Sequence, residues 1–307
     1  MLFPAMCEQT PLRILIYQQV WGTAQQPAAP GCEFIYDRSR WQEADAVVFH
    51  IPQLAKSRFP PRKLENQLWI GWCMESETNY PILARRSELG AVFDLWMTYQ
   101  KDSDIWCPYF SKRIIVSLQS EPSPKTASSP AVALISSRFD ESGRAGLLEA
   151  LMREMPIDSY GKIHRNRSEA IERTGEAKRA LISRYKFTLA FENSICKDYV
   201  TEKFFDPLRA GSVPVYLGAP NVEEFAPGDN CYIDATRFDS PRALAQLLQT
   251  LAADDNAYAH YLQWKSQPLR PRFLQMADRP ADEFHLLGDR VRAARASRAR
   301  MSSGGDC

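Results

Sequence analysis

Residues 185–218, YKFTLAFENSICKDYVTEKFFDPLRAGSVPVYLG, predict a strand, a polar loop, a helix and a second strand in close succession. The first strand is the apolar run 187–191, which is rich in strand-forming residues. Thr201 stands where a helix N-cap belongs, and Gly211 stands where that helix should end. The second buried strand follows at 213–217. This order is typical of a βαβ unit in a parallel sheet.

The loop and the helix start between these strands carry side chains that can hold a ligand. A helix that begins soon after a strand offers unpaired backbone N–H groups and the positive end of its dipole, which suits a phosphate. Lys203 adds a full positive charge there, and Glu202 can accept hydrogen bonds from sugar hydroxyls. The segment also carries Glu192, Asn193, Ser194, Lys197, Asp198 and Tyr199.

This stretch resembles the donor-binding segment of the α-1,3-fucosyltransferase family, glycosyltransferase family 10. The family carries an F-x-L-x-F-E-N-S run, a Y-V-T-E-K run and a G-x-V-P-V strand, and all three occur here in that order. An ordinary βαβ unit with a polar loop is the alternative, but such a loop has no need of this particular polar set. The resemblance implies GDP-fucose as the donor. It implies donor-binding roles for Glu192, Asn193, Tyr199, Glu202 and Lys203.

A second site is predicted in residues 68–80, LWIGWCMESETNY, where an apolar strand runs into acidic residues. A carboxylate at the carboxyl end of a parallel strand points to the edge where open α/β sheets bind ligands. The family carries an E-S-P-like run after a similar strand, and its glutamate is the general base for the acceptor hydroxyl. Glu75 matches that glutamate, whereas Glu77 stands where proline is common, a departure that bears on the shape of the loop. A solvated acidic loop is the alternative.

Two further runs are similar to the family. Residues 93–110, FDLWMTYQKDSDIWCPYF, match a T-Y-x-x-x-S-D core before a P-Y, and we interpret each matching polar residue there as structural. After a strand predicted at 131–136, the family carries an arginine that opens a helix. Arg144 matches it, which implies a guanidinium fork for phosphate oxygens. Arg138 competes for this role, and an exposed charge at a helix start is the alternative for either.

The whole chain of 307 residues suits two domains. Residues 119–130, QSEPSPKTASSP, lack an apolar face and predict an exposed linker. Strands alternate with helices on both sides of it, which indicates parallel sheets. We therefore expect an α/β protein of the family's GT-B architecture, with two Rossmann-like domains facing a cleft. The expected parts are an acceptor-binding domain at 1–125, a GDP-fucose-binding domain at 126–275, and a C-terminal helix with a basic tail at 276–307.

The resemblance implies an inverting transfer of L-fucose from GDP-fucose in glycan biosynthesis, with O3 of N-acetylglucosamine in an N-acetyllactosamine-type glycan as the expected acceptor. An α-1,4 linkage, a glucose-based acceptor and another nucleotide-sugar donor remain open. So does a non-catalytic protein that binds a sugar nucleotide or a glycan. We interpret no D-x-D run as a metal site at a strand end, so no metal site is predicted. We expect basic groups to neutralise the diphosphate, no cofactor to be required, and a divalent metal to be at most stimulatory.

Composition restricts the class of protein further. Hydrophobic residues make up 45% of the chain, enough for a sizeable core, and 38 basic residues nearly cancel 37 acidic ones, which argues against a nucleic-acid partner. The seven cysteines are odd in number and form no C-x-x-C pair, which favours free thiols in a reducing compartment.

Neither a signal peptide nor an apolar stretch long enough to span a membrane is evident near the N-terminus. We expect a soluble, bacterial-type, cytoplasmic member of the family; a chain that lacks its anchor is the alternative. Residues 282–300 predict a helix with a thin apolar face surrounded by arginines. We favour a final helix packed on the body over one in weak peripheral contact with the inner membrane face.

Overall fold

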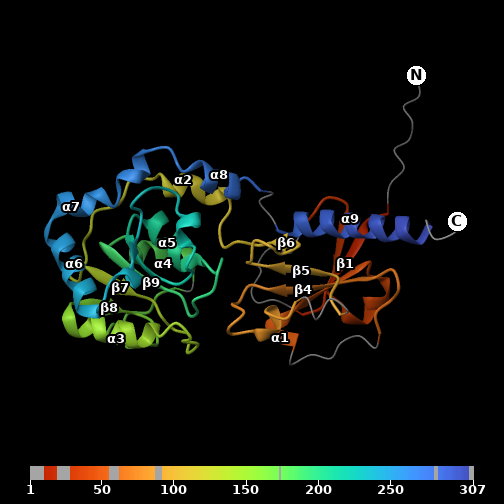
Figure 1. Cartoon of the computed structure of the whole chain (residues 1–307), viewed down its shortest axis with the longest axis horizontal. Helices are drawn as coiled ribbons and strands as arrows, with labels where there is room; N and C mark the ends of the chain where they lie inside the picture. Colours follow the sequence, from red (N-terminus) through yellow and green to blue (C-terminus); the bar gives the residue numbers. More distant parts are fainter. Residues whose placement is uncertain are drawn as a thin grey trace, which may run out of the picture. The chain divides into compact units, whose positions relative to one another are not determined.

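The computed structural model describes residues 10–18, 28–54, 62–86, 92–172, 174–279 and 283–303. The chain forms two compact units, one made of residues 1–107 and 282–307 and the other of residues 108–281. Each unit is built around one parallel sheet (Figure 1). The α/β class, with a Rossmann-like unit from each half of the chain, is therefore confirmed.

The first unit holds six parallel strands in the order β2-β1-β3-β4-β5-β6. These are β1 (Leu12–Ile16), β2 (Cys32–Ile35), β3 (Ala46–His50), β4 (Leu68–Cys73), β5 (Leu95–Thr98) and β6 (Ile105–Trp106). The described helices are α1 (Ile51–Leu54), α9 (Glu283–Ser303) and short 3₁₀ turns. Every side chain of β3 and β4 is buried, as expected for central parallel strands that are covered on both faces.

The last helix, α9, packs on the sheet of the first unit. Phe284, Leu287 and Val291 are buried in one core with side chains of β1, β3 and β4. Three of its arginines bind residues outside the helix: Arg292 donates to the carbonyl of Pro30 at 2.6 Å, Arg295 pairs with Asp45, and Arg298 pairs with Asp94. This agrees with the expected final helix packed on the body.

The second unit holds five parallel strands in the order β11-β10-β9-β7-β8. These are β7 (Ala131–Ala133), β8 (Ile157–Ser159), β9 (Phe187–Phe191), β10 (Val213–Leu217) and β11 (Ile233–Asp234). The helices are α2 (Ile115–Leu118), α3 (Arg144–Glu154), α4 (Gly175–Ile182), α5 (Glu202–Ala210), α6 (Pro241–Ala253), α7 (Asp255–His260) and α8 (Pro271–Ala277). The chain passes from β7 to β8 on one side and then to β9 on the other, so the strand order reverses between β7 and β9.

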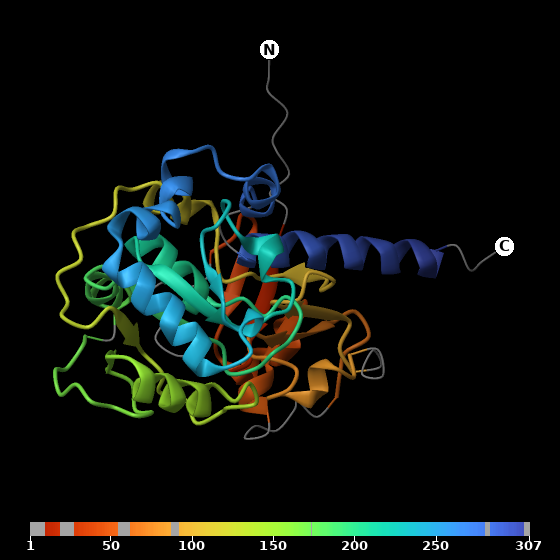
Figure 2. The same cartoon turned by 60° about the vertical axis from the view of Figure 1, so that its left-hand side comes forward.

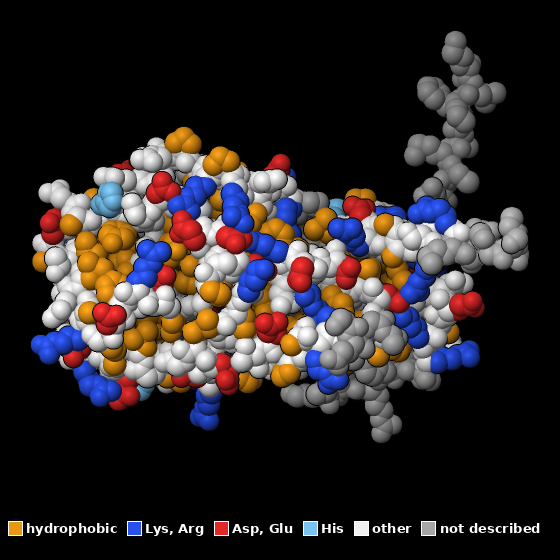
Figure 3. Space-filling model, viewed as in Figure 1, with side chains coloured by type: hydrophobic (Ala, Val, Ile, Leu, Met, Phe, Trp, Pro, Cys, Tyr) orange, Lys and Arg blue, Asp and Glu red, His pale blue; other side chains and the backbone are white. Residues whose placement is uncertain are grey.

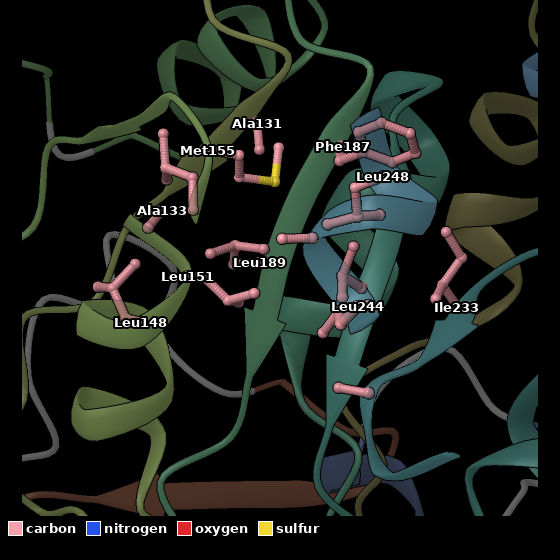
Figure 4. Close-up of a cluster of buried hydrophobic side chains, with 14 of the residues drawn as sticks. Ala131, Ala133, Leu148, Leu151, Met155, Phe187, Leu189, Ile233, Leu244 and Leu248 are labelled. Atoms are coloured by element: carbon pink, nitrogen blue, oxygen red, sulfur yellow. The ribbon is translucent and has the colours of Figure 1, made fainter. Parts of the chain in front are cut away.

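The core of the second unit lies between this sheet and the pair α3 and α6, which lie side by side on one face (Figure 2). Leu148 and Leu151 of α3 and Leu244 and Leu248 of α6 point toward Leu189 and its neighbours on the strands (Figure 4). All five side chains are almost fully buried. This packing holds the sheet rigid beneath the loops that leave its carboxyl edge.

The structure divides the chain differently from the predicted domains. The first compact unit ends at Cys107, the second extends to Ala281, and α9 returns to the first unit. Residues 119–130 belong to the second unit and do not link the two units, although most of them are exposed as predicted. Lys125 donates to the carbonyls of Ser183 at 2.9 Å and Gly211 at 2.6 Å, and Ser129 donates to Asp158 at 2.6 Å. The hydrogen bonds of Lys125 and Ser129 hold the segment in place. The sequence did not predict this attachment, because a proline- and serine-rich segment shows no periodic apolar face.

Two surface properties bear on partners. On the face in view in Figure 3, lysine and arginine side chains are mixed with aspartate and glutamate, without a stripe of one sign. In the part of the chain that the structure describes, none of the helices combines the length and apolar character needed to cross a membrane.

Candidate functional site

The candidate site lies at the carboxyl edge of the second sheet, where the strand order reverses between β7 and β9. Open α/β sheets bind ligands at such a switch point. The loop 192–200 leads from β9 to α5, and the loop 134–143 leads from β7 to α3. Ser142 joins the two loops, because its backbone N–H donates to the carbonyl of Asn193 at 3.2 Å and its hydroxyl to that of Glu192 at 2.6 Å.

The start and the end of α5 are as the sequence predicts. Thr201 is the N-cap, and its side chain accepts from the backbone N–H of Lys203 at 3.3 Å. Gly211 ends the helix with a φ of 71°, in the left-handed region that glycine adopts without strain. The first turn of such a helix presents backbone N–H groups that lack intrahelical partners.

Glu192 fastens the loop to the start of α5. It is fully buried, and its carboxylate accepts from the Thr201 N–H at 2.8 Å and the Thr201 hydroxyl at 2.9 Å, while the Lys203 ammonium lies 3.2 Å away. Gly218 leaves room for it, since a Cβ there would lie 2.6 Å from the Glu192 Cγ. Burial raises the pKa of Glu192, against the lowering effect of Lys203. Glu192 is thus a positioning residue and is not presented to a ligand.

Lys203 is held charged in the first turn of α5. Burial alone would lower its pKa, but Glu192 and Glu202 act more strongly together, and the pKa of Lys203 is raised. Its side chain remains 28% exposed, so the ammonium can reach a ligand as well as its carboxylate partners. This places a fixed positive charge beside the N–H groups of the helix start, an arrangement that suits an anion.

Glu202 is the other exposed group of the helix start, with 46% of its side chain accessible. Burial raises the pKa of its carboxyl, but Lys203 and Lys178 outweigh this, and the net pKa is lowered. Glu202 therefore presents an ionised acceptor.

Glu202 lines a pocket of about 660 Å³, which we call the α5 pocket. Its lining comes from the segments that follow β7 and β8, from the segment before α4, from α4 itself and from α5, and includes Ser136, Tyr160, Gly161, Lys162, Lys178, Glu202 and Asp206. A volume of this size is typical of ligand pockets.

Gly161 is required where the chain leaves β8, because a Cβ there would lie 2.0 Å from the carbonyl oxygen of Ile135. Residues 158–161, which contain it, close β8: Asp158 accepts from Ser129, from Arg167 at 2.8 Å and from Tyr185 at 2.8 Å.

Arg144 lies beneath the two loops and is only 1% exposed. Its guanidinium donates to the carbonyl of Phe191 at 3.2 Å and to those of Ser137 and Phe139 at 3.1 Å. Burial lowers its pKa, although Asp140 and Glu192 oppose this. The predicted fork thus binds backbone carbonyls at the ends of both loops, and its Nε is the guanidinium nitrogen without a hydrogen-bond partner.

Asn193 and Tyr199 also belong to the frame of the site. They are 6% and 2% exposed. The Tyr199 ring packs edge-on against Tyr109, with 6.2 Å between ring centroids, and its carbonyl accepts from the Tyr216 hydroxyl at 3.4 Å. Among the six donor-binding residues that the resemblance implied, Glu202 and Lys203 are the ones with partly exposed side chains.

The loop 192–200 is also fixed at Asp198, which has a φ of 65°. Its N–H donates to the Asn221 side-chain oxygen and its carboxylate accepts from the Asn221 amide, both at 2.9 Å. Sequence reasoning did not identify Asn221, Ser142 or Lys178. No local motif marks them, because their partners come from other elements.

In the first unit, Glu75 lies in the loop that follows β4 and is partly buried. Burial raises the pKa of Tyr80, and the negative charge of the nearby Glu75 carboxylate raises it further. Glu77 accepts from the Gln100 amide at 2.9 Å, and its N–H donates to the Tyr99 hydroxyl at 3.3 Å. The loop is therefore tied to the end of β5 through Glu77, and Glu75 takes no part in those bonds.

Polar residues matched in 93–110 mostly have the structural roles expected of them. Asp104 accepts from the Trp96 N–H at 2.8 Å, and Tyr99 is 1% exposed. His50, which sequence reasoning missed, ends the neighbouring strand β3 and packs edge-on against Trp72 with 5.5 Å between ring centroids. Burial lowers the pKa of His50 to about 4, so this imidazole is neutral near pH 7.

The described ranges contain no group of three or more histidine, cysteine, aspartate or glutamate side chains placed to hold a metal ion.

Comparison with protein families gives two matches. Residues 9–110 match the N-terminal fucosyltransferase model, and residues 124–295 match the C-terminal model of glycosyltransferase family 10 (fucosyltransferase). A fucosyltransferase-like protein of Arabidopsis thaliana is 40% identical over 219 residues, which cover 70% of this chain but only 39% of that protein. A 4-galactosyl-N-acetylglucosaminide 3-alpha-L-fucosyltransferase of Pan troglodytes is 35% identical over 266 residues, 82% of this chain and 69% of that enzyme.

Solved structures agree in fold. An α1,3-fucosyltransferase with GDP-fucose superposes with a TM-score of 0.60 at 16% identity, over 92% of this chain and 90% of that one. A second, with GDP, gives 0.57 at 15% identity, over 94% and 90%. The predicted GT-B class is thereby confirmed. With family models that together match most of its length, the chain belongs to glycosyltransferase family 10, the fucosyltransferases.

Proposed function

We propose that this chain transfers L-fucose from GDP-fucose to a hydroxyl of an oligosaccharide, with inversion at the fucose C1. The observation that carries the proposal is the start of α5, where Glu202 and the charged Lys203 are held at the strand switch of the second unit. Membership of the family and the GDP-fucose in a solved relative support the choice of donor.

The diphosphate of the donor lies against the first turn of α5. As the bond between C1 and the β-phosphate oxygen breaks, negative charge builds on that oxygen and positive charge on the sugar ring. Lys203 and the N–H groups of the helix start stabilise the departing GDP, because they are in place before the charge develops. Glu202, ionised and partly exposed, accepts hydrogen bonds from hydroxyls of the donor.

The buried residues act by positioning. Glu192 fixes Lys203, and Arg144 fixes the carbonyls that end both loops. The Nε of Arg144, which donates no hydrogen bond and lies 4.0 Å from the Asp140 carboxylate, is the atom proposed to meet a phosphate oxygen.

Glu75 is the general base of the proposed reaction. The acceptor oxygen attacks C1 from the side opposite the leaving phosphate, and its proton passes to the Glu75 carboxylate as the new bond forms. The place of Glu75 after β4, together with the engagement of Glu77 by Gln100, supports this choice between the two carboxylates.

We propose O3 of N-acetylglucosamine in an N-acetyllactosamine-type glycan as the acceptor. The chimpanzee relative named above, a 3-fucosyltransferase of 4-galactosyl-N-acetylglucosaminides, supports this. A 3-galactosyl-N-acetylglucosaminide 4-alpha-L-fucosyltransferase from the same species is also 35% identical, over 260 residues. A panel of saccharide acceptors is therefore needed, and it must include both 4-galactosyl- and 3-galactosyl-N-acetylglucosaminides.

The test of the donor is a GDP-release assay with the full chain. Acceptor-dependent release is expected from GDP-fucose, with little nucleotide release from GDP-mannose or UDP-galactose. Equal or faster release from another nucleotide sugar would overturn the choice of donor. Tight GDP-fucose binding without acceptor-dependent release would indicate a binding protein.

A further inference from the structure

The α5 pocket continues past the start of α5 along the helix. Besides Glu202 it is lined by Asp206, which lies four residues further along α5, one turn away on the same face. Its other walls come from α4 and from the segments around it that follow β7 and β8, so its described lining belongs to the second unit. The fucose C1 must stay open to the acceptor, whereas the nucleoside carries no reacting atom. A pocket at this place therefore suits the nucleoside of the donor.

An aromatic side chain on the wall of the pocket supports this choice. Tyr160 lines the pocket directly after β8 and is partly buried. Its hydroxyl is hydrogen-bonded to that of Tyr185 at 3.2 Å, and Tyr185 in turn donates to Asp158 at 2.8 Å, so the ring is held in place. Nucleobases stack on such rings whatever their identity. Tyr160 thus favours a base but does not select one.

Lys178 of α4 is a fixed positive group on the same wall. Its ammonium pairs with the buried Asp206 carboxylate at 3.0 Å. Together with Glu202 and Lys203 it also lines a smaller cavity of about 50 Å³. The Lys178 side chain is 26% exposed and its ammonium has three N–H groups, so donors remain for a ligand in the α5 pocket.

Two other basic residues line the pocket, and both are less suited to select a base. The Arg165 guanidinium donates to three backbone carbonyls of residues 167–169, at 2.7, 3.1 and 3.3 Å, and so holds its own loop. Lys162 is exposed to solvent. Lys178 combines a fixed position with a partly buried side chain, which strengthens a hydrogen bond to a ligand.

The edges of the bases indicate what a lysine at this place selects. Guanine presents two neighbouring acceptors, O6 and N7, which a lysine ammonium binds, whereas adenine has an amino group in place of O6. We propose that the α5 pocket takes the guanosine of the donor, and that Lys178 binds O6 and N7 of the base and selects guanine. This rests on the proposed transferase function and assigns the base preference of its donor site to one residue.

The experiment measures the affinities of the full chain for GDP, ADP and 7-deaza-GDP, which lacks the N7 acceptor, by calorimetry. The unaltered protein should bind GDP more tightly than either analogue. Lys178→Met is expected to weaken GDP binding roughly 10-fold or more, the scale of one specific base contact, and ADP binding much less. Lys178→Arg should keep the preference for GDP. Arg179→Met is the matched control, because Arg179 also pairs with Asp206, at 3.6 Å, but is not among the described residues that line the pocket.

Equal weakening of GDP and ADP binding in Lys178→Met would overturn the inference, because the lysine would then act on the parts that both nucleotides share. The same loss of GDP binding in Arg179→Met would overturn it too, since the pairing with Asp206 would be structural. Equal affinity of the unaltered protein for GDP and ADP would do so without any variant. If the unaltered protein transfers no fucose, the proposed function fails, and these nucleotide affinities still decide the inference.

Discussion

Glu75 and Glu77 lie two residues apart in the loop after β4, but their surroundings differ. Glu77 is bonded to Gln100 and holds the loop, whereas Glu75 stands two residues nearer to the end of β4. We predict that Glu75→Gln lowers turnover by ~10²–10⁴-fold, because an amide cannot accept the proton of the acceptor hydroxyl. GDP-fucose affinity should be retained. Glu77→Gln should have a much milder effect on turnover. Steady-state kinetics of both variants test this. If Glu77→Gln were the inactive variant, Glu77 would be the general base.

The Lys203 ammonium neutralises the buried Glu192, and we propose that it also binds the donor. Lys203→Ala should cut turnover by ~10²-fold or more and weaken GDP-fucose binding, as the loss of one preorganised electrostatic group commonly does. It should also lower the free energy of unfolding by up to about 3 kcal/mol, since it leaves a buried carboxylate without its partner.

The exposed Lys112 provides the control, and Lys112→Ala should change neither property. Lys203→Arg separates the two roles, since it keeps the charge and should recover most of the stability. All three variants should be compared in GDP-fucose affinity, by calorimetry, and in free energy of unfolding, by urea. Normal GDP-fucose binding by folded Lys203→Ala would contradict this account.

At the scale of elements, the carboxyl end of α5 is clamped by two lysines. Lys265, which is 5% exposed, donates to the carbonyl of Leu208 at 2.9 Å and to that of Leu118, while Lys125 donates to that of Gly211. Burial lowers the pKa of each to about 8, and for Lys125 the charge of Lys265 adds to this. The helix that carries Lys203 is therefore fixed at both of its ends.

This clamp predicts a pH dependence with a definite sign. The pKa of Lys265 is about 8 in the folded chain against 10.5 for an ordinary lysine, so between these values the unfolded chain binds more protons. The unfavourable contribution of the buried charge is complete below pH 8 and is relieved as the pH rises. The free energy of unfolding of the unaltered protein minus that of Lys265→Met should therefore increase from pH 8 to pH 10. Urea unfolding at both pH values tests this, and a difference that stays constant or decreases would refute it.

Long apolar runs made most elements predictable. The strands at 187–191 and 213–217 have the bounds expected from the sequence, because consecutive buried positions leave an unambiguous pattern. The two-residue strands β6 and β11 were not predicted, since so few residues carry no periodicity. The helix α8 was missed as well.

Within the site, sequence reasoning named the partly exposed Glu202 and Lys203 but could not separate them from Glu192, Asn193 and Tyr199, which are buried. Whether a polar side chain meets solvent or a neighbour depends on distant contacts. The room left by Gly218 for Glu192 is one example, and the bonds of Ser142 across two loops are another.

At the scale of the whole molecule, the charge needed to release GDP is proposed to come from the protein, through Lys203 and the start of α5. We expect fucose transfer to keep most of its rate in EDTA, with at most a modest stimulation by added Mn²⁺ or Mg²⁺. The rate should be measured after exhaustive dialysis against chelator. Complete loss of transfer that only a divalent ion restores would mean that an ion neutralises the diphosphate.

The central claim is that the chain transfers L-fucose from GDP-fucose to a saccharide hydroxyl with inversion. Its most direct test is the structure of the product that the full chain forms from GDP-fucose and N-acetyllactosamine, determined by NMR. The account predicts one new α-L-fucosyl residue on O3 of N-acetylglucosamine, with the anomeric configuration inverted from that of the donor. A product with the donor's configuration retained, or no fucosylated product from any saccharide of the panel, would contradict it.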